Sequence, residues 1–140
     1  MLRRLFQVIT ALALTLAGTA FLMVAPAAAA GGCTPLSQSP YLGACIEYSG
    51  GSNARADFYL NVAPDSGRYQ YTVVMYVNGN PSTLTSGMPD FTTAGRYCCW
   101  YKAVAALPRR WITLRTRVNV YTSTGAFHFY ADSPTISVFA

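Results

Sequence analysis

Alternation of apolar and polar residues with a period of two is the feature of this sequence that most limits its fold. The clearest case runs from 111 to 121, where one side of an extended chain would carry Ile112, Leu114, Val118 and Val120. In residues 56–62 the same pattern groups Ala56, Phe58, Leu60 and Val62. Successive side chains of a β-strand point to opposite faces, so this alternation indicates half-buried strands. No helical period is found over residues 31–140, and the pattern predicts an all-β domain.

Turn-forming residues separate these runs. The clearest turns are 64–67 (PDSG), 78–81 (NGNP) and 122–125 (TSTG). Between them we expect further strands at 68–78, 82–86, 95–105, 126–131 and 135–139, with a loop at 87–95 and a break at 107–110. About seven short strands with turns between them predict a small antiparallel β-sandwich.

One short motif supports this architecture. Tyr97 stands two residues before Cys99. This spacing resembles the tyrosine corner of immunoglobulin domains. The resemblance implies an Ig-like arrangement of two packed sheets, and we take the architecture alone from it.

The first thirty residues have the pattern of a secretory signal peptide. Arg3 and Arg4 precede an apolar stretch over 5–25, and Pro26 ends it. Small residues at 28 and 30 fit the A-x-A rule, so we expect cleavage near Ala30–Gly31 and a secreted, extracellular protein. Two alternatives remain open, because the stretch is almost long enough to span a bilayer and the segment before Cys33 is similar to a bacterial lipobox. They are an uncleaved anchor and a lipidated Cys33.

The chain is expected to divide into a signal peptide (1–30), an N-terminal arm (31–43) and a single β-sandwich domain (44–140). The arm holds two prolines and has glycine at both ends, which favours an extended segment or loop. Cleavage would remove two arginines and lower the net charge from +5 to +3. Such a mild charge predicts no nucleic-acid partner, and the mature form is expected to have no membrane span.

Four cysteines predict disulfide bonds in an exported protein, namely Cys33, Cys45, Cys98 and Cys99. A bond between the last two is set aside, because neighbouring Cα atoms lie about 3.8 Å apart and the usual disulfide range begins near 4.4 Å. We predict Cys45–Cys99 with Cys33–Cys98, and an exchange of these partners remains open. A metal site is not expected, since C-x-x-C spacing is absent and the chain has one histidine.

A register argument for the last hairpin predicts a polar face. With 122–125 as a four-residue loop, Arg117 faces Tyr130, Arg115 faces Asp132, and Asn119 faces His128. On the other side Val118 meets Phe129 and Val120 meets Phe127. Mixed aromatic and cationic surfaces concentrate binding energy, although a plain solvated sheet face is the alternative. The candidate binding residues are Trp111, Arg115, Arg117, Tyr121, His128 and Tyr130.

Groups that perform catalysis are not found together in the sequence. His128 has no carboxylate near it in the chain apart from Asp132, which the predicted register assigns to Arg115. The remaining acidic residues lack the spacing of glycosidases or calcium loops, and no G-x-S-x-G or phosphate-binding glycine motif occurs. We therefore expect a protein that is not an enzyme and that uses no cofactor.

These observations favour a secreted bacterial adaptor that docks onto another secreted or cell-surface protein in an extracellular assembly, of which an antibacterial toxin complex is one example. The first alternative is a carbohydrate-binding domain that stacks sugars on Trp111, Tyr121 and Tyr130. The second is a secreted enzyme inhibitor or small toxin, which would present either the 87–95 loop or the arm between Cys33 and Cys45.

Overall fold

The computed structural model describes residues 30–105 and 109–140, and every regular element in these ranges is a β-strand. The predicted signal peptide up to Ala29 and the first two residues of the predicted break at 107–110 lie outside the described residues, and Arg109 and Arg110 precede the next strand. The described part of the chain contains no helix suited to crossing a membrane. The strands are β1 (Ala30–Cys33), β2 (Leu42–Tyr48), β3 (Asn53–Leu60), β4 (Tyr69–Val77), β5 (Asn80–Thr83), β6 (Gly95–Ala103), β7 (Trp111–Thr122), β8 (Phe127–Asp132) and β9 (Ile136–Phe139).

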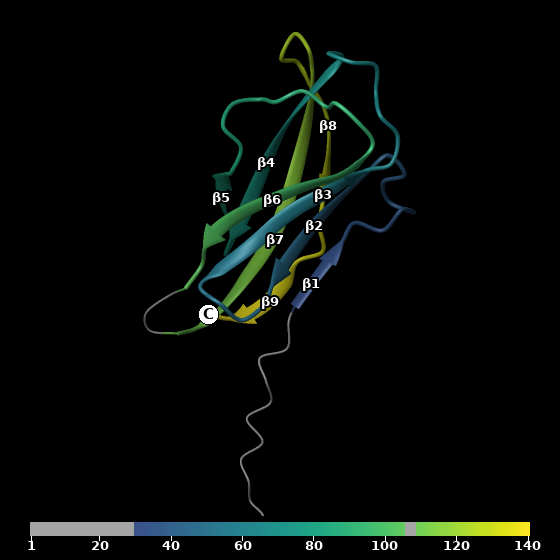
Figure 1. Ribbon diagram of the computed structural model, residues 1–140. Coiled ribbons are helices and arrows are strands. Elements are labelled where there is room, and N and C mark those ends of the chain that lie inside the picture. The colour runs from purple at the N-terminus through teal and green to yellow at the C-terminus, as the bar shows by residue number, and fades with distance from the viewer. Residues whose placement is uncertain (1–29, 106–108) are drawn as a thin grey trace, which may run out of the picture.

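The strands form two antiparallel sheets that pack face to face, which confirms the predicted β-sandwich (Figure 1). The first sheet has the order β1-β2-β3-β6, and the second has the order β5-β4-β7-β8. The strand β9 also pairs with β7, next to the part of β7 that precedes the β8 ladder. The N-terminal arm at 31–43 is predicted to be an extended segment or loop. Its first three residues form most of strand β1.

The inward faces of both sheets are apolar, as the alternation predicts. The four inward residues predicted for β7 are at most 2% exposed. On β3 the inward residues Ala56, Phe58 and Leu60 are also buried, but Val62 lies beyond the end of the strand and is 62% exposed. The predicted strand therefore extends two residues too far, because the chain leaves the sheet after Leu60.

Phe58 lies at the centre of the core. Its ring stacks on Tyr97 and Trp100 of the first sheet, with centroid distances of 4.7 and 5.8 Å. The ring also meets the edge of Tyr71 from the second sheet at 5.0 Å. Burial of one such side chain stabilises a fold by roughly 1.5–3 kcal/mol, and each aromatic pair adds about 0.5–1.5 kcal/mol. This cluster thus joins the two sheets.

Tyr97 makes the tyrosine corner that the sequence resembles. Its hydroxyl accepts hydrogen bonds from the N–H groups of Thr92 and Thr93, at 3.0 and 3.1 Å, and donates one to the Thr93 carbonyl at 2.7 Å. Burial raises the pKa of Tyr97, but the hydrogen bonds with Thr92 and Thr93 outweigh this effect and the pKa lies below its ordinary value. The corner fixes the loop before β6, whose Phe91 side chain is buried in the core.

The disulfide pairing differs from the prediction, because Cys33 is bonded to Cys45 and Cys98 to Cys99. Cys33 and Cys45 are direct partners across β1 and β2, with their Cα atoms 4.0 Å apart. The strand β6 lies at the far edge of the same sheet, and β3 separates it from β2. The predicted Cys45–Cys99 and Cys33–Cys98 bonds are therefore wrong, and so is the exchange of their partners. The Cys98–Cys99 bond, which the sequence led us to set aside, is present. The Cys33–Cys45 bond closes a short loop, which stabilises the fold by about 3 kcal/mol in chain-entropy terms.

The last hairpin keeps the predicted faces from Phe129 to Asp132 but has a different register. Arg117 faces Asp132, Asn119 faces Tyr130, and Val120 faces Phe129. The turn is one residue shorter than we assumed, since the Thr122 N–H bonds to the Ala126 carbonyl and Gly125 adopts a positive φ of 82°. A bulge at His128 adds a second residue to the shift. Beyond the bulge the shift of two residues keeps each side chain on its predicted face, so Arg115 still meets Asp132. Before the bulge the shift is one residue, so the predicted Val120–Phe127 pair is wrong: Phe127 faces Tyr121 and is 58% exposed.

We expect Tyr97→Phe to lower the free energy of unfolding by about 1 kcal/mol, because it removes the hydroxyl that holds Thr92 and Thr93. Urea denaturation followed by circular dichroism measures this loss. Tyr101→Phe is the matched control, since Tyr101 lies on the same strand and is 61% exposed. Equal stability of the two variants would show that the corner contributes nothing.

A second prediction concerns Thr116, which is fully buried on β7 and whose Oγ1 atom has no hydrogen-bond partner among the described residues. Thr116→Val keeps the shape and removes the unpaired hydroxyl, so we expect a gain of about 1 kcal/mol in stability. Thermal unfolding measures it, and Thr113→Val on the exposed side of β7 is the control. A lower melting temperature for Thr116→Val alone would contradict this reading of the core.

Candidate functional site

The outer face of the second sheet carries five of the six candidate residues predicted from the sequence. On β7 the side chains that alternate with the core include Trp111, Arg115, Arg117 and Tyr121. Tyr130 of β8 lies on the same face, next to Arg117. Because Trp111 is 71% exposed and Tyr130 is 51% exposed, this face presents aromatic surface to solvent.

The centre of this face is an aromatic and cationic cluster formed by β4, β7 and β8. The Arg117 guanidinium carbon lies 3.9 Å from the ring centroid of Tyr130 and 5.6 Å from that of Tyr76. The Arg115 guanidinium carbon lies 4.5 Å from the Tyr76 centroid. Each cation–π contact contributes roughly 0.5–2 kcal/mol. We call this group the Arg–Tyr cluster: Tyr76, Arg115, Arg117, Tyr130 and Asp132.

Asp132 holds both arginines in place. Arg117 donates two hydrogen bonds to its carboxylate, at 2.8 and 2.7 Å, and Arg115 donates one at 3.1 Å. The hydrogen bond with Asp132 raises the pKa of Arg117 above its ordinary value, although burial opposes the rise. The cluster therefore has two positive charges against one negative charge, and its side chains are held in fixed positions.

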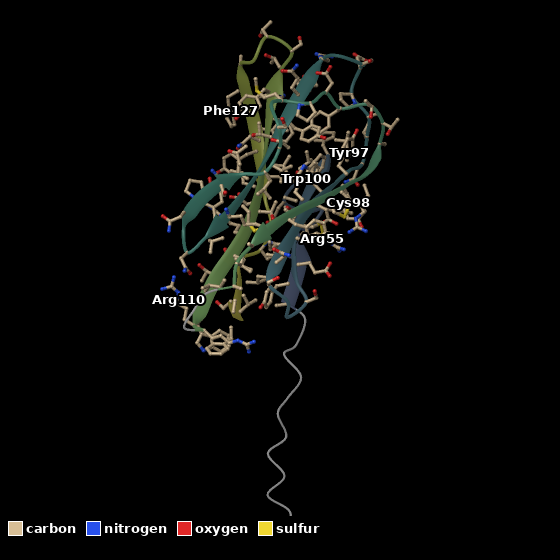
Figure 2. All side chains as sticks on the ribbon, turned by 60° about the vertical axis from the view of Figure 1, so that its left-hand side comes forward. Arg55, Tyr97, Cys98, Trp100, Arg110 and Phe127 are labelled. Carbon is tan, nitrogen blue, oxygen red and sulfur yellow. A yellow bond between two sulfur atoms is a disulfide. The ribbon has the colours of Figure 1, made fainter. Side chains whose placement is uncertain are left out.

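The other predicted residues lie away from the cluster. Trp111 meets Phe139 at one end of the face, with their ring centroids 5.8 Å apart. Tyr121 meets Phe127 near the other end, at 6.0 Å. Figure 2 shows that Phe127 and Arg110, the residue before Trp111, lie toward opposite ends of the sandwich. The structure thus brings together Arg115, Arg117 and Tyr130 but separates Trp111 and Tyr121 from them.

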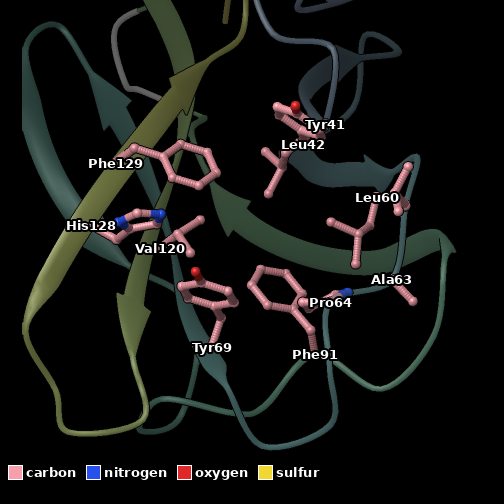
Figure 3. Close-up of a pocket in the computed structure, with 11 residues that line it drawn as sticks. Tyr41, Leu42, Leu60, Ala63, Pro64, Tyr69, Phe91, Val120, His128 and Phe129 are labelled. Carbon is pink, nitrogen blue, oxygen red and sulfur yellow. The ribbon is translucent and has the colours of Figure 1, made fainter.

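His128 does not share the polar face on which the predicted register placed it. It is the extra residue of the β8 bulge, and its ring stacks on Tyr69 with a centroid distance of 5.1 Å and an angle of 20°. It also makes a T-shaped contact with Phe129, with the ring centroids 5.3 Å apart. The imidazole therefore lines an apolar pocket at one end of the sandwich, together with the inward residues Val120 and Phe129 (Figure 3).

The outer face of the first sheet is built around a row of cysteines. Cys45 faces Cys33 on one side and Asp57 on the other, and Asp57 faces the bulge formed by Cys98 and Cys99. The Arg96 Nε atom donates to Asp57 at 2.7 Å, and this hydrogen bond raises the pKa of Arg96. Arg55 forms an ion pair with Glu47, and it lies on the same side of the molecule as Cys98 (Figure 2).

These carboxylates are bound to arginines, so they are poorly placed to act as acids or bases. Asp57 is 4% exposed. Across residues 30–105 and 109–140, no group of three or more His, Cys, Asp or Glu side chains is arranged to hold a metal ion. Both outer faces present fixed charges and rings that a binding partner could contact.

The two segments considered for an inhibitor differ in how they are held. The 87–95 loop is anchored by the buried Phe91 and by backbone hydrogen bonds with Tyr69 and Tyr71 of β4. The segment between Cys33 and Cys45 is closed by its disulfide and presents Leu36, which is 66% exposed.

Sequence reasoning missed Tyr76, which completes the Arg–Tyr cluster. Tyr76 faces Arg115 only because β4 pairs with β7 in a particular register. The two strands are separated by some thirty-five residues that include β5 and β6. A short-range pattern cannot supply such a pairing, whereas Asp132 could be found because the hairpin between β7 and β8 is local.

Replacing Asp132 tests how the cluster is held. We expect Asp132→Asn to lower the free energy of unfolding by about 1–2 kcal/mol, because two partly buried guanidinium groups lose their carboxylate. Asp65→Asn is the matched control, since the Asp65–Arg68 pair is exposed and such pairs contribute roughly 0–1 kcal/mol. Urea denaturation at low salt compares them, and losses of equal size would argue against the role of Asp132.

Comparison with protein-family models, with curated proteins and with solved structures finds no match to this chain. Its function is therefore argued from the geometry of its own surfaces.

Proposed function

We propose that this protein is a secreted, non-catalytic binding module that docks onto another extracellular protein through the outer face of its second sheet. The observation that carries the proposal is the Arg–Tyr cluster, in which one carboxylate and two tyrosine rings fix two arginines at a solvent-facing site. Secretion rests on the signal-peptide pattern of residues 1–30, and the disulfide bonds are compatible with an extracellular location.

The fixed geometry of the cluster favours binding. Ordering a flexible side chain at an interface costs roughly 0.5–1.5 kcal/mol, and Arg117 is already ordered by Asp132 before a partner arrives. Tyrosine and arginine are enriched among the residues that dominate interface energies. A partner that covers Tyr130 would therefore gain affinity without the usual entropic penalty.

The size of the face also suits a protein partner. The strand β7 runs from Trp111 to Thr122, which corresponds to roughly 35–40 Å of extended chain. Exposed aromatic residues lie at both ends of it, Trp111 with Phe139 and Tyr121 with Phe127. A standard interface covers about 800 Å² on each partner, which a face of this length can provide.

The charge of the face points to an acidic partner surface. The cluster has one more positive than negative charge, and Arg109 and Arg110 directly precede Trp111. Complementary charges on two surfaces speed association and select the partner. Their attraction weakens at high salt, because dissolved ions screen the charges. We therefore propose an acidic patch on a secreted or cell-surface protein as the docking site.

Site-directed photo-crosslinking tests this proposal. A photoreactive residue in place of Thr113, which is exposed on the outer face, should form an adduct with one protein in the culture medium of the producing cells. The same residue in place of Tyr101, on the outer face of the first sheet, serves as the control position. Equal labelling from both positions, or no protein adduct from Thr113, would overturn the proposal.

The adduct partner then permits a quantitative test. We expect Tyr130→Ala to weaken binding about 30-fold, which corresponds to about 2 kcal/mol for a residue at an interface centre. Tyr101→Ala should leave the affinity unchanged. Surface plasmon resonance at two salt concentrations measures both affinities, and a Tyr130→Ala variant that binds normally would remove the Arg–Tyr cluster from the interface.

A carbohydrate ligand is the second candidate, and the open ring of Trp111 favours it. Exposed aromatic rings can stack on the apolar face of a sugar. The crosslinking experiment distinguishes the two candidates. If the ligand is a glycan, enzymatic removal of sugars from the partner should abolish the adduct. Trp111→Ala should then reduce binding more than Tyr130→Ala does.

A further inference from the structure

The end of the sandwich between the two sheets holds an open apolar pocket of about 260 Å³. It lies where β2 and β4 begin, where β3 ends and where β8 enters the second sheet (Figure 3). Its floor consists of core residues, among them Leu42, Phe91 and Val120, which are at most 3% exposed. The pocket is separate from the Arg–Tyr cluster, whose side chains point away from the core.

The walls of the pocket are aromatic. Tyr69 and His128 stack on one another at 5.1 Å, and Phe129 makes a T-shaped contact with the imidazole at 5.3 Å. Phe91 faces them from the loop before β6 (Figure 3). Rings of this kind favour another ring, since edge-to-face and offset contacts add about 0.5–1.5 kcal/mol per pair to simple burial.

The polar groups of the pocket limit the ligand further. None of the described residues that line it carries a carboxylate, an ammonium or a guanidinium group, so the lining favours a neutral ligand over a charged one. The nearby Arg68 guanidinium lies over the Tyr69 ring, 5.4 Å from its centroid, and is not part of the lining. The Tyr69 hydroxyl and the imidazole of His128 lie on the same side of the space (Figure 3). A ligand with one hydroxyl group could exchange a hydrogen bond with either of them.

The bulge in β8 makes this arrangement. In a strand without a bulge, His128 would point to the outer face of the sheet, on the same side as Tyr130. Because His128 is the extra residue between the Val120–Phe129 and Tyr121–Phe127 pairs, its ring instead reaches Tyr69 at the pocket. Bulges commonly redirect a side chain toward a functional site.

We propose that this pocket binds a small neutral phenol: one aromatic ring with a single hydroxyl group. A dry apolar cavity of about 150 Å³ is sufficient for benzene, so a larger pocket accommodates a ring with short substituents. The mouth is apolar as well, because Tyr41 is 63% exposed and Val62 is 62% exposed. Such exposed apolar surface beside a pocket is typical of a ligand site.

Binding of p-cresol to the full secreted chain tests the proposal. Methyl signals of Leu42, Leu60 and Val120 in ¹H–¹³C NMR spectra should shift and saturate, whereas those of Val74 and Val138 should not move. Toluene, which lacks the hydroxyl, should bind about fivefold more weakly, as expected for one lost hydrogen bond. Shifts that never saturate, or that spread equally over all five residues, would overturn the proposal.

Two variants separate the ring from the hydroxyl. His128→Phe keeps an aromatic wall and should remove the preference for p-cresol over toluene if the imidazole is the hydrogen-bond partner. If the preference persists, Tyr69→Phe should remove it, and a preference that survives both changes would refute the assigned hydrogen bond. 1-Hexanol should bind at least fivefold more weakly than p-cresol, and equal binding would show a site for acyl chains instead.

A third variant blocks the space itself. Ala63 is exposed in the loop after β3 and lines the pocket, so Ala63→Trp fills it without changing the core. We expect a loss of p-cresol affinity of tenfold or more. Tyr101→Trp, on the outer face of the first sheet, is the control and should bind p-cresol normally. Unchanged affinity in a folded Ala63→Trp protein would exclude this pocket. These measurements of p-cresol binding do not depend on whether another protein docks at the Arg–Tyr cluster.

Discussion

The contact between Phe58 and the rings around it is the interaction on which the rest of this structure depends. Tyr97 and Trp100 stack on it from β6, and Tyr71 meets it from the opposite sheet. Antiparallel sheets bury one face and leave the other to solvent. The aromatic core buries the inner faces of both sheets. The outer faces can therefore carry arginines, tyrosines and disulfides that contribute little to the core.

Two bulges then determine which chemistry each surface shows. In β6 the bulge sets Cys98 and Cys99 against a single partner, Asp57, and completes the row of cysteines on the first sheet. In β8 the bulge moves His128 from the polar face to the pocket. A bulge adds one residue to one strand, leaves that residue unpaired and shifts the register beyond it by one position, so it changes which side chains share a face.

What the sequence could predict follows from how far each feature reaches along the chain. Alternation identifies β3 and β7 and assigns Phe58, Leu114 and Val118 to the core, because side-chain parity is a local property. The sequence also predicts the Arg115–Asp132 contact, since both residues lie within one hairpin. The same parity places Arg117 and Tyr130 together even though the assumed register is shifted by two residues.

The features that failed depend on sheet order or on irregular backbone. The disulfide pairing requires the knowledge that β3 lies between β2 and β6, which no local pattern contains. Alternation also places Cys98 and Cys99 on opposite faces, which the bulge at Asp57 prevents. The place of Tyr76 in the cluster and the lining of the pocket depend on long-range pairings between β4, β7 and the loops. The position of His128 depends on the bulge in β8.

The strand β8 links the two sites that we propose. Phe129 points inward and lines the pocket, whereas Tyr130, the next residue, points outward and covers Arg117. A paired strand transmits little motion between its faces, because each side chain turns about its own bonds while ladder hydrogen bonds hold the backbone. The inner site and the outer site can therefore be occupied together, and the free energy of coupling between them should fall below the 1–3 kcal/mol that is typical of allosteric proteins.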